Sequence, residues 1–438
     1  MNRRVGVLLC IVLCLGVLIP SSAHGQEARR RWERMAQIRR DKFDYVLPEA
    51  MRENRIDMWI TVVKEGLPDP LTDDLGRGYV GGIGYYVFAD RGDGRIERAA
   101  LGIDGYLLEE NGAYDIVAST SLRDFVLERD PQRIGVNMSQ KIGAADGLSH
   151  SSYLHLVETL GEPYAERLVS AEKLISDFRS RRVASEIAAF AEAGELSREI
   201  AERALSNEVI TPGVTALEDV AWWIMDELLD RGLETSFDFP SIYITGPEGI
   251  VATSNERIIQ RGDLLMIDWG VGFLNMYTDM KRIAYVLRDA ELSAPPGIQN
   301  AFDRAREVRD IIRRTIKPGP TAADMLEQLH DEISAGGFEM MKEFNVISGS
   351  DQTEVIIGCH SVGNLGHGIG PSIAWFNPLR LGFEIRPTNL FSIELFAYTA
   401  APEWGGAKVR IPLEDDAIVT ERGVEWLYPA NDRILLVR

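Results

Sequence analysis

The second half of the chain contains one helical pattern twice, and this duplication constrains the fold more than any other feature. Residues 212–232 and 318–337 both open with Pro-Gly, carry a threonine three residues after the proline, follow a helical period and end at glycine. Each is preceded by another helical segment, residues 186–205 and 297–315. Two similar halves predict a pseudo-twofold domain with helices on a curved, mostly antiparallel sheet. Chance similarity of two capped helices is the alternative.

The ends of the repeated helices carry capping signals. Thr215 and Thr321 are each followed three residues later by an acidic residue, which is typical of an N-cap and its third helical position. Gly232 and Gly336 stand where a left-handed residue ends a helix.

The N-terminus has the pattern of a secretory leader. An apolar run at residues 5–19 follows two arginines, and Ala23-His24-Gly25 fits the small-x-small cleavage rule. We expect residues 1–25 to be a signal peptide and the mature protein, from Gln26, to be exported to the periplasm or the medium, with no membrane attachment. An uncleaved anchor is the alternative.

The exported part contains one cysteine, because Cys10 and Cys14 lie in the leader and only Cys359 follows it. An intrachain disulfide in the mature protein is therefore excluded. The formal net charge of −20 argues against a nucleic-acid partner, since such proteins gather positive charge to meet phosphates.

The chain divides by pattern into two domains. Residues 26–170 alternate helix-like and strand-like segments without a chemical cluster, which predicts a smaller α/β domain. Residues 171–438 form the second domain, which opens with a long, Arg-rich and Glu-rich helical region. The expected fold class is α+β.

Acidic residues interrupt the apolar strands of the second domain. Asp268 and Asp279 are eleven residues apart on the two arms of an expected hairpin, Glu394 interrupts "FSIELFAY", and Glu414 opens "EDDAIVT". Buried carboxylates are costly unless a cation or strong donors compensate them. With His367, inside the glycine-rich "GNLGHGIG", they predict a divalent metal site suited to Mn²⁺, Fe²⁺, Co²⁺ or Zn²⁺ rather than Ca²⁺.

These residues resemble those of the pita-bread metallopeptidases, the M24-type family that includes methionine aminopeptidase, aminopeptidase P, prolidase and the metal-free creatinase. The aspartate pair, the Gly-His-Gly-Ile-Gly motif at residues 366–370, the glutamate after Phe-Ser-Ile and the Glu-Asp-Asp strand all occur in the family's order. The creatinase-like α/β domain before them places the resemblance in the aminopeptidase P and prolidase branch.

The resemblance implies two metal ions, Mn²⁺ first and Co²⁺, Zn²⁺ or Fe²⁺ as alternatives. Asp279 and Glu414 would bridge them, Asp268 would bind one ion, and His367 and Glu394 would bind the other. Glu394 would also be the catalytic proton carrier during attack on the peptide carbonyl. The substrate would be a peptide or another small amide, and the branch often forms homodimers.

The sequence also departs from the family. Active members carry a second histidine seven residues after the ligand histidine, but Ala374 stands there, and the expected histidine upstream of the aspartates is missing from residues 245–263. The Cys359-His360 pair is interpreted as a partly buried thiol and a loop histidine rather than as ligands. Arg410 lies four residues before Glu414, where the aminopeptidase P branch tends to carry an arginine two residues before. Substrate recognition is therefore harder to carry over than metal binding.

Three functional hypotheses follow. The first is an exported metallopeptidase that cleaves at proline, like an Xaa-Pro aminopeptidase or prolidase. The second is a metal-dependent hydrolase of another amide or C–N bond, with a pocket rebuilt around Ala374. The third is a binding protein in which metal ions only stabilise the fold.

Overall fold

The computed structural model describes residues 26–92, 94–343, 351–365 and 367–438. The predicted signal peptide lies outside these residues, and so does Gly366 of the glycine-rich motif. Within the described part, no helix has both the length and the apolar character needed to cross a membrane.

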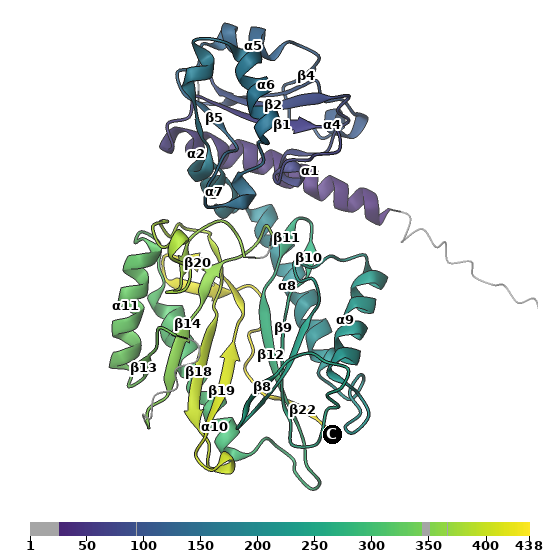
Figure 1. The fold of residues 1–438 in the computed structure, drawn as a ribbon, viewed down its shortest axis with the longest axis vertical. Helices are drawn as coiled ribbons and strands as arrows, with labels where there is room; N and C mark the ends of the chain where they lie inside the picture. The colour runs from purple at the N-terminus through teal and green to yellow at the C-terminus, as the bar shows by residue number, and fades with distance from the viewer. Residues whose placement is uncertain (1–25, 93, 344–350, 366) are drawn as a thin grey trace, which may run out of the picture.

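The N-terminal unit is a mixed sheet covered by helices, drawn at the top of Figure 1. Its strands are β1 (Met58–Lys64), β2 (Ile83–Asp90), β3 (Ile96–Leu101), β4 (Ile116–Ala118), β5 (Ile134–Val136) and β6 (Leu168–Ser170), in the sheet order β4-β3-β2-β1-β5-β6. Its helices are α1 (Glu27–Tyr45), α2 (Leu47–Glu53), α3 (Thr72–Leu75), α4 (Tyr106–Glu110), α5 (Leu122–Arg129), α6 (His150–Leu160) and α7 (Glu172–Ser180).

The C-terminal unit contains the two predicted halves, which are each a helix pair packed on a sheet (Figure 1). In the first half, α8 (Ala184–Ala204) and α9 (Leu217–Arg231) share a core with the sheet β22-β12-β9-β7-β8. In the second half, α10 (Pro296–Thr315) and α11 (Ala322–Ala335) share a core with the sheets β13-β14-β18-β19 and β16-β15-β17-β20-β21.

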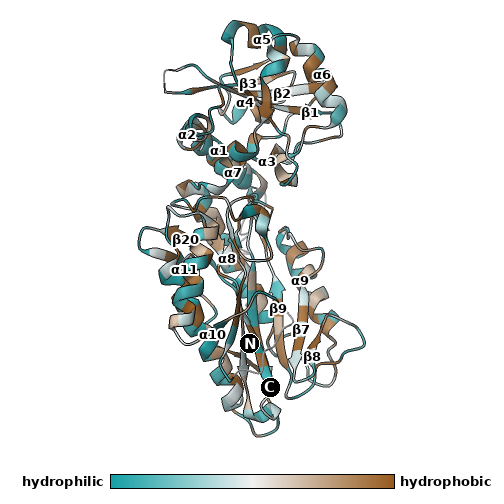
Figure 2. Cartoon of the chain, turned by 60° about the vertical axis from the view of Figure 1, so that its left-hand side comes forward, coloured by the Kyte–Doolittle hydropathy of each residue, from teal (hydrophilic) through white to brown (hydrophobic). Residues whose placement is uncertain are grey.

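The strands of this unit carry or flank the predicted acidic residues. Those of the first half are β7 (Ser241–Gly246), β8 (Gly249–Val251), β9 (Leu264–Trp269), β10 (Gly272–Phe273), β11 (Met276–Tyr277) and β12 (Met280–Val286), with β22 (Leu435–Val437) added at the edge. The others are β13 (Glu339–Met340), β14 (Glu354–Ile357), β15 (Cys359–Ser361), β16 (Ser372–Ile373), β17 (Leu390–Ser392), β18 (Leu395–Ala400), β19 (Lys408–Leu413), β20 (Asp416–Thr420) and β21 (Gly423–Trp426). Figure 2 shows hydrophilic residues along the outer helices α10 and α11, as expected for helices that cover a buried sheet.

The observed α+β architecture, with a pseudo-twofold C-terminal unit behind a smaller α/β unit, confirms the predicted fold class. Of the predicted caps, Thr321 accepts a hydrogen bond from Asp324 N (3.2 Å), and Gly232 is left-handed (φ 58°). The prediction for Thr215 was wrong, because the first α9 turn is capped at Ala216, whose N–H donates to Asp219 Oδ2 (2.8 Å). Gly336 is also not left-handed, and the turn falls on Gly337 (φ 81°).

The long helical region predicted from residue 171 is broken. Helix α7 ends at Ser180, and α8 begins at Ala184. Leu174, Ile175 and Phe178 of α7 pack in the core of the N-terminal unit. Arg179 of α7 and Arg182, which lies between the two helices, are buried.

Candidate metal centre

The aspartate pair is positioned by one hairpin. Strands β9 and β12 pair antiparallel, and the register sets Asp268 directly opposite Lys281. Asp279 immediately precedes β12, and its backbone N–H donates to Asp416 Oδ2 (3.1 Å). Because side chains alternate along a strand, Asp279 and Lys281 extend toward the same face.

The two glutamates lie where the chain passes from one sheet to another. Glu394 separates β17 from β18, and Glu414 separates β19 from β20, and both carboxylates reach Lys281 of β12 in the first half. Gly358 is needed beside Glu394, because a Cβ at that position would lie 2.2 Å from Glu394 Oε2. Glu414 accepts a short hydrogen bond from the Ser392 hydroxyl.

His360 is the histidine that lies deepest in the centre. It is on strand β15 with 8% of its side chain exposed, and its Nε2 lies 3.5 Å from Glu414 Oε1 and 3.7 Å from Asp279 Oδ2. The interpretation of His360 as a loop histidine outside the site was therefore wrong.

His367 lies at the rim of the same centre. Its Nε2 is 3.9 Å from Asp279 Oδ2, its ring centroid is 4.8 Å from that of His360, and 72% of its side chain is exposed. Close packing requires glycine next to this histidine, since a Cβ on Gly368 would lie 2.7 Å from Ser361 O.

The N-terminal unit anchors the loop that carries His367. Ile369 is buried in the core of that unit, and its carbonyl accepts a hydrogen bond from Ser176 Oγ of α7 (2.7 Å). Arg380 Nη1 donates to the carbonyl of His367 (2.5 Å). Contacts from both units therefore hold this histidine in place.

A lysine occupies the middle of the carboxylates. Lys281 Nζ lies 2.7 Å from Glu394 Oε1 and 3.1 Å from Asp268 Oδ2, and it donates a short hydrogen bond to Glu414 Oε2. Burial opposes charge on this amine, but the surrounding carboxylates raise its pKa well above the ordinary value. The residue is therefore a buried ammonium ion.

The same charges shift the carboxyl groups in opposite directions. Burial opposes ionisation of Glu414, but the charge of Lys281 and the hydrogen bond from His360 lower its pKa to about 2. Burial and the neighbouring negative charge of Glu414 raise the pKa of Asp279 well above its ordinary value. Asp279 is thus a carboxylate that lacks sufficient cationic compensation and would gain from a bound cation.

The structure brings together the five residues predicted as ligands, Asp268, Asp279, His367, Glu394 and Glu414. Within the described residues, three groups have ligand atoms within 4.8 Å of one another: Asp279, His360 and His367; His360, Glu394 and Glu414; and Asp268, Asp279 and Glu414. This donor set fits a divalent ion. It does not fit the predicted pair of ions, because Lys281 already bonds three of the four carboxylates.

Two residues of the centre were missed from the sequence, although each left a signal. Lys281 follows Asp279 by two residues, which is the spacing that puts both side chains on one face of a strand. His360 precedes His367 by seven residues, the histidine spacing expected of the family. Ala374, seven residues after His367, is buried, so the departure from the family at that position stands.

A small cavity opens beside the centre. Its volume is about 270 Å³, and its lining includes Asp268, Lys281, Tyr243, Phe396 and Arg410. The Arg410 guanidinium lies 4.5 Å from the centroid of the Phe396 ring. A cavity of this size suits a small substrate.

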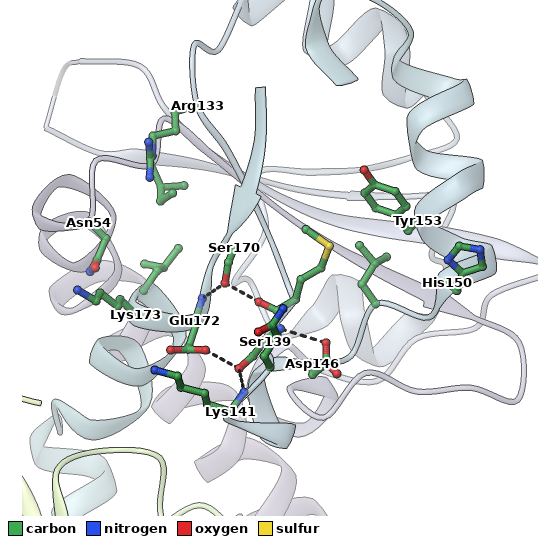
Figure 3. Close-up of a pocket in the computed structure, with 15 residues that line it drawn as sticks. Asn54, Arg133, Ser139, Lys141, Asp146, His150, Tyr153, Ser170, Glu172 and Lys173 are labelled. Carbon is green, nitrogen blue, oxygen red and sulfur yellow. Dashed lines mark hydrogen bonds between the residues drawn. The ribbon is translucent and has the colours of Figure 1, made fainter. Parts of the chain in front are cut away.

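A larger hollow, of about 830 Å³, lies in the N-terminal unit, and none of the predicted ligands lines it (Figure 3). Ser139 bridges its acidic residues, since Ser139 Oγ donates to Glu172 Oε2 (2.5 Å) and Ser139 N donates to Asp146 Oδ1 (3.0 Å). The acidic groups there are held by protein donors and not left for an ion.

Residues 188–421 match the metallopeptidase family M24, and this match covers more than half of the chain. The chain belongs to metallopeptidase family M24. Family membership confirms the resemblance predicted from the sequence and supports a metal-dependent peptidase. A separate match of residues 5–43 to the T cell CD4 receptor C-terminal region lies on the predicted leader and α1, too short to indicate a family.

Relatives of this M24 protein carry names from the expected branch. Xaa-Pro aminopeptidase 2 of Streptomyces coelicolor is 28% identical over 192 residues, which are 40% of this chain and 38% of that protein. The X-Pro aminopeptidase of Thermotoga maritima has the same fold, with a TM-score of 0.64, 16% identity, and coverage of 89% of this chain and all of that one. The Xaa-Pro dipeptidase of Bacillus anthracis matches with a TM-score of 0.59 and 22% identity, and the match covers 93% of this chain and 99% of that one.

Proposed function

We propose that this M24 protein is a metal-dependent peptidase that cleaves small peptides at a bond next to proline. The observation that carries the proposal is the convergence of Asp279, His360 and His367 with three further carboxylates beside a small cavity. The family match and the names of the relatives support the choice of substrate.

The residues have distinct proposed roles. Asp279, His360 and His367 would hold a divalent ion, which supplies Lewis acidity and acidifies a bound water when present. Glu394 would carry a proton between water and the leaving amine. Burial raises the pKa of Glu394 while Lys281 opposes the rise, which suits a group that both accepts and returns a proton.

The cavity would orient the substrate. Tyr243, Ile250 and Phe396 supply apolar wall, against which a proline ring could pack, and Arg410 supplies a positive charge for a peptide carboxylate. Export to the periplasm or medium remains part of the proposal. It rests on the leader at residues 1–25, and sequencing the N-terminus of the secreted protein would test for cleavage before Gln26.

The first test is hydrolysis of Xaa-Pro dipeptides and tripeptides, with matched peptides lacking proline, after supply of Mn²⁺, Co²⁺, Zn²⁺ or Fe²⁺ separately. We expect metal-dependent turnover of the proline peptides only. An Asp279→Asn variant should lose at least about 10²-fold in kcat/KM. Asp289→Asn, at a side chain that is 95% exposed, is the matched control and should leave turnover unchanged.

The outcomes separate the hypotheses. Turnover of amides without proline would favour the hydrolase of another C–N bond. Metal binding without turnover of any amide would favour the binding protein. Either result would contradict the proposed Xaa-Pro activity.

A further inference from the structure

The ammonium group of Lys281 lies where a cation is required by the carboxylates of the centre. It contacts Asp268 across the β9–β12 pair and Glu394 and Glu414 from distant strands, and only 7% of its side chain is exposed. The protein therefore supplies a cation of its own, the Lys281 side chain, to three carboxylates of the centre. Its consequence concerns the number of metal ions that the centre can hold.

Two ions and the ammonium group compete for the same oxygens. In the predicted two-ion arrangement, Asp268 belongs to one ion, Glu394 to the other, and Glu414 bridges them. An ion at the usual distance of about 2.0–2.2 Å from these oxygens would lie close to Nζ, in a buried place where like charges repel strongly. Lys281 therefore excludes an ion that depends on these carboxylates.

One of the three candidate ligand groups contains no ion-pair partner of Lys281. The groups containing Glu394 and Glu414, or Asp268 and Glu414, both include its partners. The group of Asp279, His360 and His367 includes none of them. Two imidazoles and one carboxylate, with a side open to solvent at His367, make the donor set of a catalytic zinc site.

We propose that the ammonium group of Lys281 takes the place of one metal ion, and that the centre binds a single divalent ion, preferably Zn²⁺, through Asp279, His360 and His367. This inference rests on the proposed function only in that the centre binds metal. It differs from the two ions, with Mn²⁺ first, that the family resemblance implies.

The test is metal stoichiometry. Chelator-treated wild-type protein is titrated with Zn²⁺ by calorimetry, and the washed product is analysed for bound zinc. We expect one ion per chain in the wild type and two in Lys281→Met, whose carboxylates need a new cation. Lys408→Met removes another lysine that is 7% exposed and is paired with Glu354 (3.1 Å), and this control should still bind one.

Two further variants locate the ion without altering Lys281, in case Lys281→Met does not fold. His360→Ala should weaken Zn²⁺ binding by roughly 100-fold. Asp268→Asn should change it by less than about threefold, because an Asp268 held by Lys281 is not a ligand. A Mn²⁺-loaded wild type should show the electron paramagnetic resonance spectrum of isolated ions, not of exchange-coupled pairs.

The inference would be overturned by two bound ions, or no bound ion, in the wild type. It would also be overturned by a single bound ion in Lys281→Met, or by a loss of Zn²⁺ binding in Asp268→Asn and not in His360→Ala. None of these measurements depends on turnover. An inactive protein with one zinc would contradict the Xaa-Pro activity and leave this inference standing, while an active protein with two ions would do the reverse.

Discussion

Arg282 follows Lys281 on β12, so its side chain extends from the opposite face of the strand. Its Nη1 donates to Asp415 Oδ1 (2.7 Å), and Asp415 also accepts a hydrogen bond from Asn431 N (2.8 Å). In this ion pair, 2% of the Arg282 side chain and 0% of the Asp415 side chain are exposed. Adjacent residues of one strand thus compensate carboxylates in two separate places.

Arg282→Met should lower the free energy of unfolding by about 3–5 kcal/mol, because it leaves the buried Asp415 charge without its main partner. Urea denaturation measures the loss. Arg422→Met removes the exposed pair with Glu425, in which Arg422 is 83% exposed, and should change stability by less than about 0.5 kcal/mol. Equal effects in the two variants would contradict this account of Arg282.

Helix α8 approaches the strands of the centre through a glycine. A Cβ on Gly194 would lie 2.1 Å from the ring of Tyr428. The Tyr428 hydroxyl donates to Asp416 Oδ2 (3.0 Å), the oxygen that also accepts the backbone N–H of Asp279. The packing of one helix therefore supports the position of a predicted ligand.

Gly194→Ala should reduce the free energy of unfolding by about 2 kcal/mol, since overpacking against Tyr428 outweighs the gain of about 1 kcal/mol in helix propensity. Thermal and urea denaturation would measure it. Gly382→Ala is the matched control, because a Cβ there meets no atom within 4 Å, and its stability should be unchanged or slightly higher. A Gly194→Ala protein as stable as this control would show that Tyr428 moves freely.

The two units of the molecule are joined by ion pairs as well as by Ile369. Lys42 of α1 lies 3.1 Å from Glu186 of α8, and Glu53 of α2 accepts a hydrogen bond from Arg386 (3.0 Å). In Figure 1, α1 and α2 lie at the side of the N-terminal unit that faces the C-terminal unit. The loop of His367 is anchored across this junction. A change in the contacts between the units would therefore change the position of His367 in the centre.

Glu53 makes part of this junction dependent on pH. Partial burial opposes its ionisation, but the hydrogen bond from Arg181 and the charge of Arg386 lower its pKa below the ordinary 4.5. A depressed carboxyl pKa contributes stability above the unfolded value and loses it as the pH falls through the folded value.

Glu53→Gln should therefore be less stable than wild type by about 0.5–1 kcal/mol at pH 7, a small figure because solvent screens this partly exposed group. The difference should shrink below pH 4.5, which urea denaturation across the acid range would measure. Glu33→Gln, on the exposed face of α1, is the control. A difference that stays constant with pH would exclude ionisation of Glu53 as its cause.

The elements and most residues of the centre could be predicted from the sequence. The duplicated helical pattern, the apolar strands and the acidic residues that interrupt them are local signals, so Asp268, Asp279, Glu394 and Glu414 could be found without coordinates. The alternation of β12 also fixes the face of Lys281, but not what lies opposite that face.

Which of these groups meet depends on how the sheets pack in space. Glu394 and Glu414 reach Lys281 from 113 and 133 residues away, and no local pattern encodes such contacts. The same holds for the histidines, where packing of three sheets buries His360 and leaves His367 at the rim. The number of cations in the centre depends on these distances, because a buried carboxylate can be satisfied by an ion or by an amine, and only position in space distinguishes the two.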